Sequence, residues 1–324
     1  MKKLLSSLLI ITILIGSSVF ASADVSTLTE PANEIVSCYY ISTASLLALG
    51  CDESNLIGIE KKADSRPLYQ ICAPYLLTVP AVGSGKEVNL EEILLLNPDL
   101  AVLPQKLQDE ALRLNELGIS AVTVNPESTQ GFQDCIRLLG SLTGREQQAK
   151  DLLVYLSDIQ QNLDEKLSGV SPVSVYISAE SSVFITYPNG MFQNDLISSA
   201  GGINVAGEVF GNAKVTIDPE QLLKWDPDYI IIVSGADYTP EDVLNDPQLS
   251  ELSAVKNKNV YAMPSGIESW DVPSPSSILG TVFVAGLLHP EQISHEDVIR
   301  TAADFYQNFY GFTPTEAQLG LTAE

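Results

Sequence analysis

Two stretches of the sequence repeat one pattern: NLEEILLLNPDLAV at residues 89–102 and DPEQLLKWDPDYII at residues 218–231. Matching positions keep a constant separation, so that Glu91 corresponds to Glu220 and Asp99 to Asp228. Each copy starts with a residue type that caps helices, continues as a short helix, stops at Pro-Asp and ends in an apolar strand. A helix followed by a buried strand, found twice, predicts βαβ units and parallel sheet.

Short apolar segments typical of buried strands surround each copy. They are residues 35–36, 56–59, 100–103 and 121–124 in the first half and residues 173–177, 229–233 and 260–262 in the second. Between the two groups, residues 144–167 carry apolar side chains three or four positions apart, and Thr143 and Glu146 have the spacing of a capping box. We therefore predict an α/β fold of two lobes, each with a mainly parallel central sheet flanked by helices, joined by one long rigid helix, with a ligand cleft between the lobes.

The beginning of the chain has the pattern of a cleavable secretory signal over residues 1–23. Lys2 and Lys3 precede an apolar run, and Ala21-Ser22-Ala23 resembles a cleavage site. Since the first cysteine is Cys38, we expect a periplasmic protein without a lipid anchor. The remaining segments that we expect are an N-terminal lobe at residues 24–143, the linking helix at 144–168, a C-terminal lobe at 169–288 and a helical tail at 289–324.

Composition restricts the possible partners. The 324 residues contain 17 Lys+Arg and 41 Asp+Glu, and the net charge of -24 excludes electrostatic attraction to nucleic acid or anionic lipid. An exported protein can form disulfides, and the four cysteines, Cys38, Cys51, Cys72 and Cys135, allow three pairings between which spacing does not decide. No C-x-x-C occurs, so a zinc or redox motif has no support.

Ligands of open α/β sheets lie outside the carboxyl ends of the strands, so the candidate binding residues follow the predicted strands. The first lobe offers Tyr39, Tyr40, Lys61, Arg66, Ser84 and Gln105, and the second offers Glu180, Tyr187, Met191, Trp270 and Asp271. Basic side chains gather in the first-lobe loops of an otherwise acidic chain. Together with aromatic faces, they suit a flat or aromatic anionic chelate.

An enzyme is not predicted. His289 and His295 are the two histidines, and both follow the last predicted strand, so neither a histidine-based triad nor a multi-histidine metal site can form in the cleft. No dinucleotide-binding, phosphate-binding or nucleophile-elbow motif occurs. We therefore expect no catalytic residues and no cofactor. A secreted adhesion or cell-wall module is an alternative of another class, but it predicts display repeats and tethering signals that this sequence lacks.

The order of these segments resembles the substrate-binding proteins of ABC importers for iron-siderophore complexes, haem and cobalamin, the class with a rigid helical linker. The resemblance spans residues 35–311, and its markers are the segments 36–37, 48–50, 89–99, 220–228, 269–275, 279–280 and 288–291. It implies a monomeric two-lobed binder that hands its ligand to a membrane permease and ATPase. It also implies that Glu91 and Glu220, one on each lobe, dock onto permease arginines.

The resemblance places a metal chelate, above all a ferric siderophore, first among the ligands. Haem, cobalamin and an oxyanion such as molybdate or tungstate stay open. Haem would use Tyr39 or Tyr40 as an oxygen ligand to iron. An oxyanion would use Ser84, Ser234 and loop N–H groups as donors.

Overall fold

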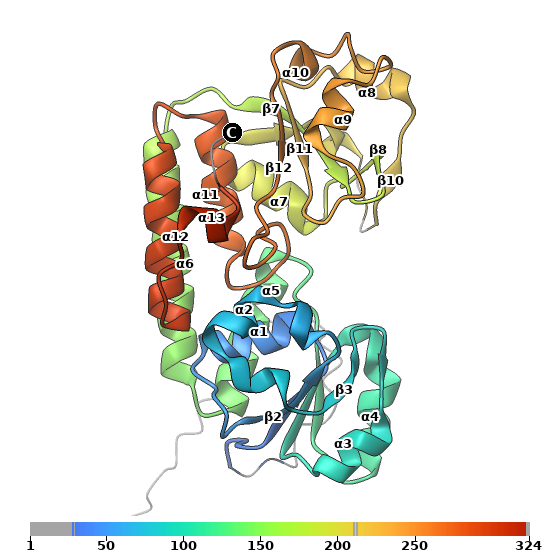
Figure 1. The fold of residues 1–324 in the computed structure, drawn as a ribbon, viewed down its shortest axis with the longest axis vertical. Coiled ribbons are helices and arrows are strands. Elements are labelled where there is room, and N and C mark those ends of the chain that lie inside the picture. Colours follow the sequence, from blue (N-terminus) through green and yellow to red (C-terminus); the bar gives the residue numbers. More distant parts are fainter. Residues whose placement is uncertain (1–27, 29, 210, 212, 322–324) are drawn as a thin grey trace, which may run out of the picture.

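The computed structural model describes residues 28, 30–209, 211 and 213–321, and the predicted signal peptide lies outside this range. Two α/β lobes lie one above the other, and the long helix α6 (Glu146–Leu167) joins them along one side (Figure 1). Gly169, with a positive φ of 78°, follows this helix, as the sequence predicts. The predicted fold class is confirmed.

The N-terminal lobe is built on a sheet with the strand order β4-β3-β2-β1-β5-β6, in which every neighbouring pair is parallel except β3 and β4. Its strands are β1 (Ile35–Ser37), β2 (Leu56–Glu60), β3 (Ala81–Ser84), β4 (Glu87–Val88), β5 (Leu100–Pro104) and β6 (Ala121–Val124). Its helices are α1 (Tyr40–Ala48), α2 (Pro67–Cys72), α3 (Leu90–Leu96), α4 (Gln108–Glu116) and α5 (Thr129–Leu142), with short 3₁₀ turns at Ala63–Ser65, Pro74–Leu77 and Gln105–Leu107.

The C-terminal lobe has a mixed sheet with the order β10-β8-β7-β11-β12, and β9 pairs with the beginning of β7. The strands are β7 (Val173–Ala179), β8 (Ser182–Thr186), β9 (Gly202–Asn204), β10 (Val215–Thr216), β11 (Tyr229–Ile232) and β12 (Val260–Ala262). The helices are α7 (Phe192–Ser199), α8 (Pro219–Trp225), α9 (Pro240–Leu244), α10 (Ser253–Lys256) and α11 (Ser277–Leu288), with a 3₁₀ turn at Val205–Glu208, and the tail adds α12 (His295–Tyr310) and α13 (Glu316–Leu319). All seven predicted strands overlap observed ones.

The internal repeat is a repeat of structure as well as of sequence. Asn89 and Asp218 cap α3 and α8, and each side chain accepts a hydrogen bond from the backbone N–H three residues later. Asp99 and Asp228 follow these helices and accept hydrogen bonds from N–H groups at or just before the first residues of β1 and β7. Each Pro-Asp therefore ends a helix and fixes the start of a neighbouring central strand.

The linking helix α6 starts later than the sequence predicts. Thr143 does not cap it, because the Thr143 hydroxyl donates to the carbonyl of Leu139 and completes the end of α5. Gly144, with a φ of 66°, then turns the chain, and α6 begins at Glu146. The predicted capping box is therefore wrong, whereas the predicted helix is confirmed. Its 22 residues make it about 33 Å long.

A second helix braces the two lobes. The tail helix α12 runs beside α6 (Figure 1) and carries the aromatic side chains that pack against it, with the ring of Phe309 5.1 Å from that of Tyr155. Tyr310 at its end donates a hydrogen bond of 3.2 Å to the carbonyl of Ala44 in α1 of the other lobe. One continuous cluster of buried side chains runs through both lobes and this tail. The tail helix α12 and the linking helix α6 thus form a frame that holds the two lobes together.

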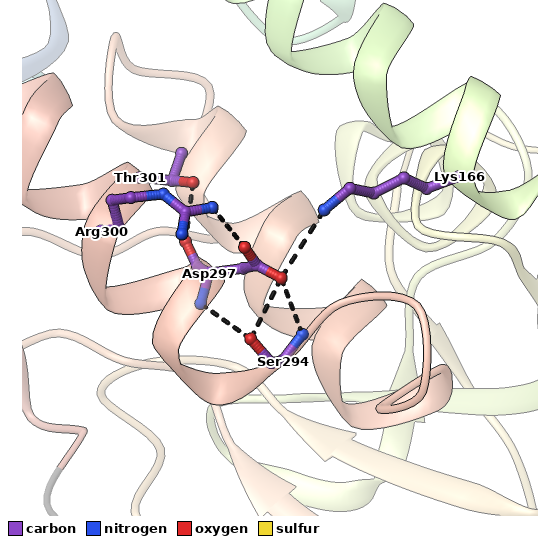
Figure 2. A network of polar contacts seen from close by, with 5 residues as sticks. All are labelled: Lys166, Ser294, Asp297, Arg300 and Thr301. Atoms are coloured by element: carbon purple, nitrogen blue, oxygen red, sulfur yellow. Dashed lines mark hydrogen bonds and ion pairs between the residues drawn. The ribbon is translucent and has the colours of Figure 1, made fainter.

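Polar contacts fix the start of α12 against the end of α6 (Figure 2). Asp297 accepts hydrogen bonds from the N–H and the hydroxyl of Ser294, which form a capping box. Its carboxylate also pairs with Arg300 and lies 3.6 Å from the amine of Lys166 on α6. These contacts, with backbone donors foremost, lower the pKa of Asp297 to about 2.

Candidate functional site

The carboxyl ends of the N-terminal strands form one wall of the cleft between the lobes. A hollow of about 350 Å³ lies at the ends of β5 and β6 and is lined by Tyr39, Pro104, Gln105, Lys106, Val124, Asn125, Pro126 and Glu127. The hydroxyl of Tyr39 donates to the carboxylate of Glu127 at 3.2 Å. A Cβ at Gly85 would lie 3.4 Å from the Tyr39 ring and 3.9 Å from the Lys106 amine, so Gly85 lets both side chains lie over the β3–β4 turn. This hollow brings Tyr39 and Gln105 together.

The basic residues of this wall follow neighbouring strands. Lys61 and Lys62 follow β2, Lys86 lies between β3 and β4, and Lys106 follows β5. All four side chains are exposed. Lys61 forms an ion pair of 2.9 Å with Glu87, and Ser84 lies at the end of β3 in the same edge. Four exposed lysines thus follow the strand ends of the N-terminal lobe, and Lys106 lines the hollow.

The C-terminal wall is mixed in charge. Glu180 follows β7 and forms an ion pair with Lys214, whose amine lies 5.3 Å from the centre of the Tyr187 ring. Burial opposes the charge of Glu180, but hydrogen bonds, chiefly from Lys214, outweigh it and lower the pKa of Glu180. Lys214 is not among the residues that the sequence predicts, because no motif marks this single lysine before β10. Met191 lies at the start of α7 and packs against the core.

Two predicted ligand contacts in the loop before α11 are buried. Trp270 is 1% exposed and its indole N–H donates to the hydroxyl of Tyr306, so the predicted stacking face of this indole is covered by core side chains. Asp271 is 2% exposed and accepts hydrogen bonds from the N–H and the hydroxyl of Ser234. Asp271 therefore holds the loop after β11 in place and does not reach the open cleft. The placement of Trp270 corrects the expectation for that residue.

Tyr40 and Arg66 lie at the junction of the lobes. The hydroxyl of Tyr40 donates to the carboxylate of Glu268, 3.0 Å away in the C-terminal half. The guanidinium of Arg66 lies 4.0 Å from the centre of the Tyr40 ring. Glu60, beneath them in the N-terminal lobe, accepts hydrogen bonds from Tyr69 and Thr43, each at 2.7 Å.

The histidines and cysteines are not among the residues that line the hollow at the cleft wall. His289 contacts the carbonyl of Gly201, and His295 pairs with Glu316 in the tail. The four cysteines are free thiols, three of them buried. Across residues 30–209 and 213–321, no three His, Cys, Asp or Glu side chains are grouped so that they could hold a metal ion.

Glu91 and Glu220 occupy equivalent positions on the two lobes. Each is the second residue of its helix, α3 or α8, and each is exposed. Leu95, one helical turn after Glu91, is 80% exposed. The two carboxylates thus lie on surfaces that the internal repeat relates to each other.

Comparison with known proteins decides the family. The family model described as "periplasmic binding protein" matches residues 35–266. The chain belongs to this family. Among curated relatives, the molybdate-binding protein MolA of Haemophilus influenzae is 26% identical over 267 residues, which cover 75% of each chain. The haem uptake protein IsdE of Staphylococcus aureus is 24% identical over 271 residues, 79% of this chain and 90% of that one.

Solved structures agree with this assignment. A periplasmic solute-binding protein of Veillonella parvula is 26% identical with a TM-score of 0.77, and the match covers 91% of this chain and 92% of that one. CeuE of Helicobacter pylori in complex with Ni-His, 21% identical, shares the fold with a TM-score of 0.74 over 90% of this chain and 94% of that one. The predicted family is confirmed, and the chain is the substrate-binding component of an ABC importer, not an enzyme. Within the described residues, no helix is long and apolar enough to cross a membrane.

Proposed function

We propose that the chain binds an anionic metal chelate, with a ferric siderophore as the first candidate, in the cleft and delivers it as a monomer to an ABC permease outside the cytoplasm. The observation that carries this proposal is the basic N-terminal wall. Lys61, Lys62, Lys86 and Lys106 lie at the ends of three strands in a chain whose net charge is -24. Such local positive charge concentrates an anion that the rest of the molecule repels.

The side chains favour a chelate over a bare metal ion. A bare divalent ion needs several protein ligands, and the described residues contain no such group. A chelate brings its own metal ligands and needs cations and aromatic faces from the protein. Tyr39 and Lys106 on one wall and Lys214 on the other offer these groups, whereas Tyr187, 3% exposed, is buried beneath Lys214 and presents no open face.

Haem and cobalamin have less support. A tyrosine binds ferric iron as a phenolate, but burial raises the pKa of both Tyr39 and Tyr40 well above the ordinary value, and nearby glutamates raise it further. Their hydroxyls already donate to Glu127 and Glu268. An oxyanion is the second candidate, because MolA, at 26% identity, is named for molybdate binding and Ser84 offers a hydroxyl donor at the N-terminal wall, whereas the Ser234 hydroxyl already donates to Asp271.

Thermal unfolding with a ligand panel tests the proposal. The mature protein is mixed with ferric tris-catecholate and tris-hydroxamate complexes, haemin, cobalamin, Ni-His, molybdate and tungstate. A true ligand at 100 times its Kd adds about 2.7 kcal/mol of stability. We expect a ferric chelate to have this effect and Lys106→Gln to weaken it, whereas Lys150→Gln, an exposed change on α6, leaves it unchanged. Stabilisation by molybdate alone would favour the second candidate, and stabilisation by neither anion would refute the proposal.

We further propose that Glu91 and Glu220 dock onto the permease. A helix N-terminus favours an acid at this position by about 0.3–1 kcal/mol, which explains one glutamate but does not require its repetition at the same position of both lobes. Neither carboxylate forms an ion pair within residues 30–209 and 213–321, so both can take a cationic partner. Leu95 beside Glu91 adds apolar surface that such a partner would cover.

A further inference from the structure

Glu268 links the two lobes through a buried hydrogen bond. The residue lies in the segment between β12 and α11 and is 3% exposed. Its carboxylate accepts a hydrogen bond from the Tyr40 hydroxyl across the lobe junction. Tyr40 is the first residue of α1, and its ring supports the guanidinium of Arg66. Glu268, Tyr40 and Arg66 therefore form a chain of contacts from the buried segment before α11 to the half-buried Arg66 of the N-terminal lobe.

Two polar groups of this chain have unused hydrogen-bonding capacity. Within the described part of the protein, the Arg66 side chain makes no hydrogen bond or ion pair, and its Nε is buried without an acceptor. Glu268 Oε2 is also buried without a partner. A guanidinium fixed by stacking, with its donors free, is preorganised to take an anionic group.

Several elements surround the Glu268 carboxyl. Tyr40 of α1, Arg66 before α2, Ser276 before α11 and Tyr306 of α12 favour its charged form, and Cys72 and Tyr310 lie close enough to interact with it electrostatically. Burial nevertheless dominates and raises the pKa of Glu268 to about 7. Arg66 is the cation among these neighbours, so the charge of Glu268 depends on how far that guanidinium is neutralised.

We propose that Glu268 is a positioning residue of the ligand site: through Tyr40 it holds Arg66 ready for a negative group of the ligand, and it takes up one solvent proton when that group binds. This inference rests on the proposed anionic ligand. The bound anion neutralises Arg66 and repels the Glu268 carboxylate, so the protonated acid becomes favoured. The proton adds to Oε2, the oxygen without a partner, and the hydroxyls of Ser276 and Tyr306 lie near the carboxyl group.

The sign of the pH dependence follows from linkage. If the anion raises the pKa of Glu268 by one unit, binding becomes about tenfold tighter well below that pKa than well above it. Binding should consume up to one proton between the two pKa values and none at lower pH, where Glu268 is already protonated. The variant Glu268→Gln, whose side chain is neutral and has nearly the same shape, should remove the pH dependence of ligand affinity and keep the tight binding at alkaline pH.

Calorimetry of the whole mature protein tests this inference, with a ferric tris-catecholate complex and molybdate as probes. Titrations in two buffers of different ionisation enthalpy, at about pH 6 and about pH 8, measure the protons taken up. We expect uptake at the higher pH for the wild type and none for Glu268→Gln, which should bind at pH 8 as tightly as the wild type does at pH 6. Arg66→Gln should lose at least tenfold in affinity at the lower pH. Tyr40→Phe, which keeps the ring but removes the hydroxyl donor, should move the uptake to higher pH.

The outcomes separate this inference from the proposed function. Binding of a probe by the wild type without proton uptake would overturn the role of Glu268 and leave the anionic ligand standing. A pH-independent loss of affinity in Glu268→Gln would assign it a purely structural role and also overturn the inference. Failure of both probes to bind would overturn the proposed function, and the inference with it. Glu60→Gln, which changes the other buried carboxyl near Arg66, should leave the uptake intact, and loss of uptake in that variant would assign the proton to Glu60.

Discussion

Replacing Glu268 with glutamine should make the ligand-free protein more stable at alkaline pH. Burial raises the pKa of Glu268 from 4.5 to about 7, so the folded protein holds its proton more tightly than the unfolded chain. The free energy of unfolding therefore decreases as the pH rises from the unfolded-state pKa of 4.5 through the folded-state pKa of about 7. At one pKa unit per 1.36 kcal/mol, the charged carboxylate costs about 3 kcal/mol above pH 8. The glutamine oxygen can still accept the Tyr40 hydroxyl, and its amide group can donate to the oxygens near Oε2.

Urea unfolding of the two proteins at several values between about pH 5.5 and pH 8.5 measures the difference. We expect Glu268→Gln to be more stable than the wild type by about 1 kcal/mol at the acidic end and by about 3 kcal/mol at the alkaline end. Glu291→Gln, an exposed change of the same kind, should show no such gain. A difference that does not vary with pH would refute the reasoning, because it would mean that Glu268 does not titrate in this range.

Three further predictions concern the frame and its partner. Asp297→Asn should lower the free energy of unfolding by about 1 kcal/mol above pH 4, after allowance for solvent screening. This difference should vanish as the pH falls toward 2, because the pKa of Asp297 is lowered in the folded protein. In the same urea titrations, the control Asp304→Asn on the same helix should lower the free energy of unfolding by less. Alanine at Glu91 and Glu220 should leave ligand affinity in calorimetry unchanged but reduce uptake by cells, and normal uptake would reject the docking role. Solution scattering should give nearly equal radii of gyration with and without ligand, since α6 and α12 both brace the lobes; a large compaction would contradict the rigid frame.

Local sequence patterns predicted most of the architecture. The repeated helix and strand, with their caps at Asn89 and Asp218, are specified by neighbouring residues, and the structure confirms both. The apolar strands at the centre of each sheet are visible as short hydrophobic runs for the same reason. The strands β3, β4, β8, β9 and β10 were not predicted, and β4 and β10, of two residues each, carry too few side chains to form a pattern. They depend on neighbours that are distant in the sequence.

The site was harder to predict because its roles depend on long-range contacts. Position after a strand selected Tyr39 and Gln105, and both line the same hollow at the ends of β5 and β6. The same criterion selected Trp270, whose partner Tyr306 belongs to a tail helix that the sequence did not connect to the cleft. Glu268 precedes that tryptophan by two residues, and only the fold brings it to Tyr40. The position of a residue just after a strand therefore predicts at which end of the sheet the residue lies. Its tertiary contacts determine whether its side chain faces the ligand.

Charged groups of the frame and of the site differ in how their hydrogen bonds are satisfied. Asp99, Asp228 and Asp297 have their hydrogen bonds filled by backbone donors, as stabilising groups do. Arg66 Nε and Glu268 Oε2 are among the four buried side-chain atoms without a partner in the described residues. Buried groups without a partner lower the free energy of unfolding. The shared core and the two bracing helices, α6 and α12, offset this loss. We therefore expect binding to need neither lobe closure nor ordering of Arg66, and affinity to depend on how well an anion fits donors that are already in place.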